Sequence, residues 1–185
     1  MCDWSSDVCS SDLALAEADS VAAVSFLRRL HAFPKPAIAA AEGIAMGLGV
    51  SMLLHCDFAY AGHSIRLQLP FSRFALSPIG ATTLLLPRLA GPKAASGMLL
   101  LGSAFSAREA REIGLLTDTA PAGRALEQAF DCAARLLARP LDGLLATKAL
   151  MREGQAEAVN AALDRAERAL LERCRSPEAQ SAIDA

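Results

Sequence analysis

The chain has 185 residues, of which 53% are hydrophobic and 21% charged, and 18 basic against 20 acidic side chains give a formal net charge of −2. A chain of this kind can bury the core of one domain, and it lacks the basic surface typical of nucleic-acid binding. No apolar run reaches the roughly 18 residues that a membrane-spanning helix needs. We therefore expect neither nucleic acid nor a membrane among its partners.

The cysteines indicate the compartment, and the first thirteen residues stand apart from the rest of the chain. There are five cysteines, and no pair has the spacing of a metal site, so we expect no metal and a reducing cytoplasm. Residues Met1–Leu13 read MCDWSSDVCSSDL and show no helical or strand period. This stretch resembles a translated sequencing adapter, so we exclude it from fold prediction; a native disordered tail is the alternative.

The first half of the remaining chain alternates between helix and strand signals. Apolar residues at three-residue spacing predict an amphipathic helix that ends before Pro34 and Pro36, since proline cannot continue a helix. The expected elements, in chain order, are a helix over Ala14–Ala32, a strand buried on both faces over Ala37–Ala41, a turn at Glu42-Gly43, a glycine cluster over Ala45–Gly49, a buried helix over Val50–His55, and strands over Asp57–Ala61 and Ile65–Leu69. This order is typical of α/β layering.

The second half is mostly helical by spacing. A capping box at Ser106–Glu109 marks one helix start, and Ser176-Pro177 marks another. The expected elements are a loop over Phe71–Ile79, a helix over Ala81–Leu86 closed near Pro87, and helices over Lys93–Leu101, Ser106–Ile113, Leu126–Ala138, Leu141–Arg152 and Gln155–Arg175, with a last helix from Pro177.

The stretch from Lys35 to Asp57, KPAIAAAEGIAMGLGVSMLLHCD, carries the strongest chemical signal. It places a glycine cluster before a helix start, where free backbone N–H groups and the helix dipole favour a negative oxygen. Such a cluster is as often a packing device. A dinucleotide-binding reading of Gly47-Leu-Gly49 is disfavoured because Met52 stands where a third small residue belongs and Asp57 follows too soon.

The same stretch resembles the second oxyanion-hole segment of the enoyl-CoA hydratase/isomerase (crotonase) family. Its continuation, LPFSRFALSPIGATTLLLPRLAGPKAASGMLLLGSAFSAREAREIGLLTDTAP, resembles that family almost throughout. The resemblance implies an α/β fold built as a spiral of βαβ units, with a C-terminal helical region that packs in trimers. It covers the chain from about Ala14 to the C-terminus. We expect a tail over residues 1–13, an α/β core over 14–121 and a helical region over 122–185.

The resemblance also implies acyl-CoA binding. One of two oxyanion-hole N–H groups falls on Leu48, flanked by Gly47 and Gly49, and the segment carrying the first has no counterpart in this chain. The family's catalytic acid positions fall on Ser51, Phe71 and Ile79, none of which is acidic. A serine in a helix often bonds the preceding turn, which we favour for Ser51 over a role as base.

Other positions receive minor roles. Met46, Phe71, Phe74, Pro78 and Ile79 are candidates for an apolar acyl pocket or plain core. We interpret Asp57 as a structural cap, Glu42 as solvent-facing and His55 as a core residue; Arg152, Arg165 and Arg168 are interpreted as a solvated helix face. The segment RSPEAQSAIDA resembles the family's closing helix, after which we expect a phenylalanine and basic residues that help to hold CoA.

The function expected by resemblance is that of an enoyl-CoA hydratase or isomerase that stabilises a thioester enolate, with the CoA thioester as substrate and no cofactor. The alternative is a catalytically degenerate homologue that binds acyl-CoA or serves only as an assembly subunit. Thioester hydrolysis or decarboxylation is a third possibility. For the full-length protein, the resemblance implies a homotrimer or a dimer of trimers. We expect this chain alone not to express as an abundant, soluble and monodisperse protein, because sheet edges lack partners.

Overall fold

The computed structural model describes residues 13–183. Its elements, in chain order, are α1 (Leu13–His31), β1 (Ile38–Ala41), β2 (Ile44–Met46), α2 (Leu48–His55), β3 (Phe58–Gly62), β4 (Arg66–Gln68), the 3₁₀ helix η1 (Pro70–Phe74), α3 (Thr82–Ala90), α4 (Pro92–Leu100), β5 (Phe105–Ser106), α5 (Ala107–Glu112), β6 (Asp118–Ala120), α6 (Ala125–Leu137), α7 (Leu141–Cys174) and α8 (Pro177–Ile183).

The strands form two small sheets, and the chain passes back and forth between them. One sheet has the order β1-β3-β6 with parallel neighbours, in a register that pairs Ile38 with Phe58 and Tyr60 with Asp118. The other has the order β2-β4-β5, in which β2 and β4 are parallel and β4 and β5 antiparallel. Because β1 and β2 adjoin in sequence but enter different sheets, each winding of the chain contributes to both. This is the α/β spiral that the resemblance predicts.

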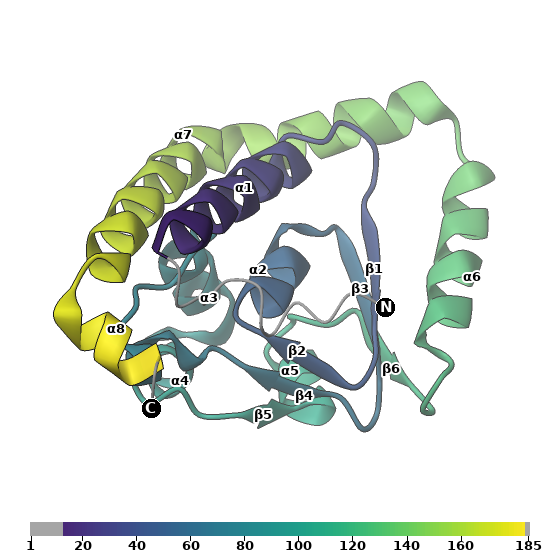
Figure 1. Ribbon diagram of the computed structural model, residues 1–185. Helices are drawn as coiled ribbons and strands as arrows, with labels where there is room; N and C mark the ends of the chain where they lie inside the picture. The colour runs from purple at the N-terminus through teal and green to yellow at the C-terminus, as the bar shows by residue number, and fades with distance from the viewer. Residues whose placement is uncertain (1–12, 184–185) are drawn as a thin grey trace.

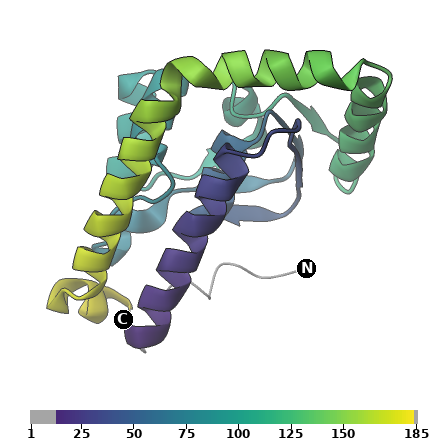
Figure 2. The ribbon, with the colours of Figure 1, turned by 90° about the horizontal axis from the view of Figure 1, so that it is seen from above.

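The helices lie around these sheets. Helix α6 packs on β1 and β3, while α2 contacts α1, β2 and α3 (Figure 1). Helix α7 runs beside α1, and Figure 2 shows that α7 changes direction part-way along its length. The main apolar core is formed largely by residues of α2, β3, β4 and α3, together with the inner face of α1 and of the second half of α7.

Most expected elements form where the pattern placed them. The helix expected over Ala14–Ala32 is α1, and the capping box is present, with the Ser106 hydroxyl accepting from the Glu109 N–H while Glu109 accepts from the Ser106 N–H. The residue Leu13, which we assigned to the tail, is the first residue of α1; residues 1–12 of that tail lie outside the described residues.

Five expectations about local structure were wrong. Strand β1 is only half-buried because, within residues 13–183, it is an edge strand. Residues Ala45 and Met46, assigned to the glycine cluster, belong to strand β2 (Ile44–Met46). Helix α3 continues through Pro87 to Ala90; the carbonyl four residues earlier, on Thr83, loses its donor but belongs to an exposed residue that water can reach.

The fourth concerns α7. We expected two helices separated near Gly154, and the structure has one continuous helix over Leu141–Cys174. A glycine in a helix interior weakens it without ending it. In addition, the first part of the loop expected over Phe71–Ile79 is the short helix η1.

Candidate functional site

The turn between β2 and α2 is built on Gly47. Its φ of 48° and ψ of −103° form a backbone conformation that a residue with a Cβ rarely adopts. The Gly47 N–H donates to the Gln68 carbonyl at 2.9 Å, which ties the turn to β4. A Cβ at Gly47 would lie 3.4 Å from Cζ of Phe71. Glycine is therefore required here by the backbone conformation, while a Cβ would make only ordinary van der Waals contact with the ring.

Leu48 is the first residue of α2, so its N–H has no acceptor inside the helix. The Leu48 side chain is 5% exposed and belongs to the apolar core. The position thus offers a ligand only its backbone amide. That amide lies at the positive end of the helix dipole, which favours an oxygen carrying negative charge. The oxyanion-hole role that the resemblance implies for Leu48 stays a prediction.

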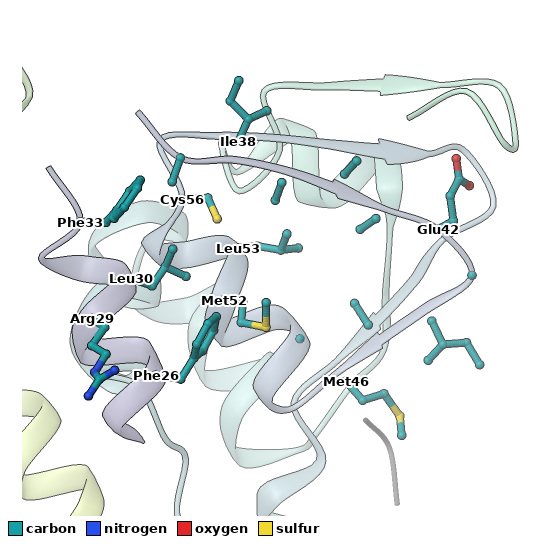
Figure 3. Close-up of a pocket in the computed structure, with 18 residues that line it drawn as sticks. Phe26, Arg29, Leu30, Phe33, Ile38, Glu42, Met46, Met52, Leu53 and Cys56 are labelled. Atoms are coloured by element: carbon teal, nitrogen blue, oxygen red, sulfur yellow. The ribbon is translucent and has the colours of Figure 1, made fainter. Parts of the chain in front are cut away.

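A groove of about 1100 Å³ lies beside this turn (Figure 3). Its lining comes from α1, from the continuous stretch Ala37–Met46, and from the residues of α2 that face α1 and β1. Met46 and Gly49, on either side of the Gly47-Leu48 peptide, both line it. Apart from Arg29 and Glu42, its described lining carries no charge, so the groove suits an uncharged apolar chain.

The three positions that the resemblance assigns to catalytic acids lie close to the turn, and two of them are sealed. Ser51 and Ile79 are 0% exposed, and Phe71 is buried against Gly47. The Ser51 hydroxyl donates to the Gly47 carbonyl at 3.0 Å, which confirms the expected bond to the preceding turn. Within the described residues, these positions therefore supply no carboxylate to the groove.

The candidates for an acyl pocket separate in the structure. Met46 lines the groove, whereas Phe71, Phe74, Pro78 and Ile79 do not. Phe74 packs against the main core, to which Ile79 belongs. A role for these four side chains in substrate binding stays a prediction.

The carboxylate in the groove lining is that of Glu42, which we interpreted as solvent-facing. Its residue is exposed, but its Oε1 also accepts from the Ala125 N–H at 3.1 Å, at the first residue of α6. Glu42 therefore satisfies one of the free amides at the start of α6. Its second oxygen crowds Gly62, where an added Cβ would collide with the carboxylate.

Behind the groove, Asp57 ties the residue before β1 to two side chains of α7. Its carboxylate accepts from the Ala37 N–H at 2.7 Å, from Lys148 at 2.6 Å and from Arg152 at 2.9 Å. Burial alone would raise the pKa of Asp57, but these hydrogen bonds and cations bring it below its usual value. The expected structural role of Asp57 is confirmed, while the assignment of Arg152 to a solvated face was wrong, because its side chain is only 19% exposed.

Two histidines adjoin this cluster, and their partners fix the role of one nitrogen in each ring. Arg152 only donates, so Nδ1 of His31 accepts from it at 2.7 Å; the Gly80 carbonyl only accepts, so Nε2 of His55 donates to it at 2.7 Å. Burial, then the nearby Arg152 charge, lowers the pKa of His31 to about 4, and burial also lowers that of His55. His55 is 0% exposed, which confirms it as a core residue.

Sequence reasoning missed two residues near the site. Lys148 is 6% exposed and pairs with Asp57, yet only its four-residue spacing from Arg152 on a predicted helix hinted at a shared face. Cys56 lines the groove, and burial raises the pKa of its thiol. No sequence motif marks it.

Among residues 13–183, no helix is long and apolar enough to cross a membrane, and no three acidic, His or Cys side chains gather as a metal site would require.

Comparison with known proteins decides the family. The model of the family described as "Enoyl-CoA hydratase/isomerase" matches residues 7–184. The chain belongs to the enoyl-CoA hydratase/isomerase family. The match starts seven residues before Ala14, from which the sequence resemblance was drawn.

Individual members of the enoyl-CoA hydratase/isomerase family support this. The chain is 35% identical to the 2,3-dehydroadipyl-CoA hydratase of Escherichia coli over 154 residues, which cover 80% of this chain and 60% of that protein. It is 33% identical to the 1,2-epoxyphenylacetyl-CoA isomerase of the same organism, over 75% of this chain and 53% of that protein.

Solved structures agree. Pseudomonas aeruginosa OdaA superposes with a TM-score of 0.84 at 36% identity, covering 86% of this chain and 65% of that one. An enoyl-CoA hydratase/isomerase from Mycobacterium paratuberculosis gives a TM-score of 0.86 at 25% identity, covering 96% and 71%. The chain thus spans about 60 to 65% of the length of the first relatives it matches.

Proposed function

We propose that the protein binds an acyl-CoA thioester and holds the thioester oxygen on the Leu48 N–H. The observation that carries this is the Gly47 turn, which leaves that amide without a helical acceptor beside the apolar groove. Negative charge that develops on the oxygen in the transition state strengthens this hydrogen bond, so the amide lowers the barrier to enolate formation. Membership of the family supports the substrate class.

Position 48 allows a direct test, because proline at the first position of a helix removes the N–H at little cost to the helix. We expect Leu48→Pro to weaken binding of butyryl-CoA to this chain, measured by isothermal titration calorimetry. Leu48→Ala is the matched control, since it loses the same core side chain but keeps the amide. Equal affinity of the two variants for butyryl-CoA contradicts the proposal.

The acyl chain is proposed to lie in the groove, where Cys56 serves as a reporter. Butyryl-CoA is expected to protect the Cys56 thiol from iodoacetamide, measured by mass spectrometry of the Cys56 peptide. Cys132 is a suitable control because it is buried in the separate cluster formed with Tyr60 and Ala129. Labelling of Cys56 at the same rate with and without saturating butyryl-CoA places the acyl chain elsewhere.

For the whole protein we propose hydratase or isomerase activity on an enoyl-CoA. A second candidate is a homologue that binds acyl-CoA without turning it over, and it is favoured by the buried, non-acidic Ser51 and Ile79. Thioester hydrolysis or decarboxylation is a third candidate. Assays of the full-length protein with crotonyl-CoA and a 3-enoyl-CoA separate them: turnover of either eliminates the binding-only candidate.

We also propose that residues 122–185 form the helical region through which the full-length protein assembles as a trimer or a dimer of trimers. The apolar side chains of Leu126, Phe130 and Leu137 on α6 support this, since they are 58%, 66% and 86% exposed. Sedimentation of the full-length protein as a monomer would contradict this assembly.

We also propose that the protein is cytoplasmic, and fractionation of the producing cells tests this location.

A further inference from the structure

A set of buried polar contacts leads from the Gly47 turn to the start of α3. The Gly47 carbonyl accepts from the Ser51 N–H and from the Ser51 hydroxyl, both at 3.0 Å. The Ser51 and Thr82 hydroxyl oxygens lie 2.9 Å apart, and Thr82 also reaches the Ile79 carbonyl. The residues Ser51, Thr82 and Ile79 are each 0% exposed, so no water competes for these groups.

The position of the Gly47 carbonyl determines the direction of the Leu48 N–H. The two groups belong to one planar trans peptide, in which the oxygen and the hydrogen point in opposite directions. Glycine has no side chain to restrict the rotation of this peptide. A hydroxyl that holds the Gly47 oxygen therefore also aims the Leu48 amide away from the helix.

The hydrogens available restrict how this works. The Ser51 and Thr82 hydroxyls supply two hydrogens, but three contacts could each take one. These are the contact of Ser51 with the Gly47 carbonyl, the contact between the two hydroxyls, and the contact of Thr82 with the Ile79 carbonyl. Both carbonyls only accept, so the Thr82 hydroxyl donates to Ile79 and the Ser51 hydroxyl donates to Gly47, which uses both hydrogens. The Thr82 oxygen is then an alternative acceptor for the Ser51 hydrogen, in competition with the Gly47 carbonyl.

We infer that Ser51 is a positioning residue that holds the Gly47-Leu48 peptide so that its amide faces the thioester oxygen, and that Thr82 is the competing acceptor for the same hydroxyl hydrogen. Neither residue touches the substrate. Ser51 occupies a position where the family resemblance expects a catalytic acid, and here it acts on the turn instead. The inference rests on the proposed function of the Leu48 amide.

The test compares two ligands that differ at the thioester carbonyl alone. Butyryl-CoA has this oxygen, and the thioether S-butyl-CoA lacks it. Affinities of both for the wild-type chain and its variants are measured by calorimetry. The variants are Ser51→Ala and Thr82→Val, with Thr82→Ser keeping the hydroxyl. Ser96→Ala is the matched control, because the Ser96 hydroxyl also donates to the carbonyl four residues earlier but lies in α4.

We expect Ser51→Ala to reduce the preference for butyryl-CoA over S-butyl-CoA by about fivefold, the effect of one hydrogen bond, and Thr82→Val, which removes the competing acceptor, to keep the preference at or above the wild-type value. Affinity for S-butyl-CoA stays at the wild-type value, as does the preference in Thr82→Ser and Ser96→Ala. A purely structural role lowers both affinities together and leaves the ratio unchanged, which would overturn the inference. If the wild-type chain shows no preference between the ligands, the proposed function itself fails.

Discussion

Asp57 and Lys148 lie 91 positions apart in the chain, yet their side chains meet at 2.6 Å and are 12% and 7% exposed. Arg152 shares the same carboxylate, so one buried anion holds two cations of α7 against the ends of α1 and α2. This cluster fixes the first half of α7 to the α/β core, and its consequences for stability can be measured.

Removal of Asp57 is expected to destabilise the fold strongly. In Asp57→Ala, Lys148 and Arg152 lose their anion while remaining largely buried, and breaking such a pair typically costs about 3–5 kcal/mol in the free energy of unfolding. Urea denaturation measures the change. Glu112→Ala is the control, because its pair with Arg108 is 3.9 Å long between side chains that are 61% and 83% exposed. The control should lose less than about 1 kcal/mol, and a similar loss in both variants refutes the prediction.

The pH dependence of the free energy of unfolding should show the lowered pKa of His31. Its pKa falls from 6.5 to about 4 on folding, so between these values only the unfolded chain binds the proton. Stability from this group is complete above pH 6.5 and is lost as the pH falls toward 4, with a slope of at most about 1.4 kcal/mol per pH unit.

The substitution His31→Gln keeps an acceptor for Arg152 and removes the titration. Denaturation between pH 7 and 4.5 should give the variant a smaller slope than the wild type. The Asp57 carboxylate acts in a separate window, since its lowered pKa removes stability only as the pH falls below its usual 3.8. Identical slopes in wild type and variant would show that His31 is not held neutral.

Gly47 should tolerate no side chain. Gly47→Ala places a Cβ on a backbone with φ of 48°, so we expect a loss of about 1–3 kcal/mol in the free energy of unfolding. Gly97→Ala serves as the comparison, because Gly97 lies inside α4 with no atom within 4 Å of an added Cβ. Thermal denaturation should show Gly47→Ala melting lower and Gly97→Ala melting at or above the wild-type temperature.

Gly154→Ala is expected to stabilise the protein. Gly154 lies within α7, an added Cβ meets nothing within 4 Å, and alanine in a helix is favoured over glycine by about 1 kcal/mol. For a chain of this size, that raises the melting temperature by about 2–4 °C. A lower melting temperature would mean that the change of direction in α7 depends on this glycine.

The sequence predicted those features that arise within a short stretch. Proline placement ended α1, and the Ser106–Glu109 spacing identified a helix start that the structure has. The glycine cluster pointed to the turn before α2. Each of these features depends on backbone conformation or on groups within a few residues of one another, so the neighbouring residues are enough to predict the feature.

The features that it missed depend on distant parts of the chain. Strand β2 has three residues, too few for a period, and exists because β4 pairs with it. Arg152 sits on a helix rich in charge, and only the fold brings Asp57 within 2.9 Å of it. Likewise, nothing near Ser51 in the sequence indicates that Thr82 lies beside it. Packing between elements decides these contacts.

Because the donor at position 48 is a backbone N–H, it affects which substitutions this position can accept in evolution. Replacement of Leu48 by another amino acid other than proline retains the N–H, while the core decides which side chains fit. On the proposed function, selection on the chemistry therefore acts at Gly47, whose conformation aims the peptide, rather than on the side chain at position 48. A comparison of side chains alone would then show the glycine of the turn but not the backbone N–H that is proposed to hold the oxygen.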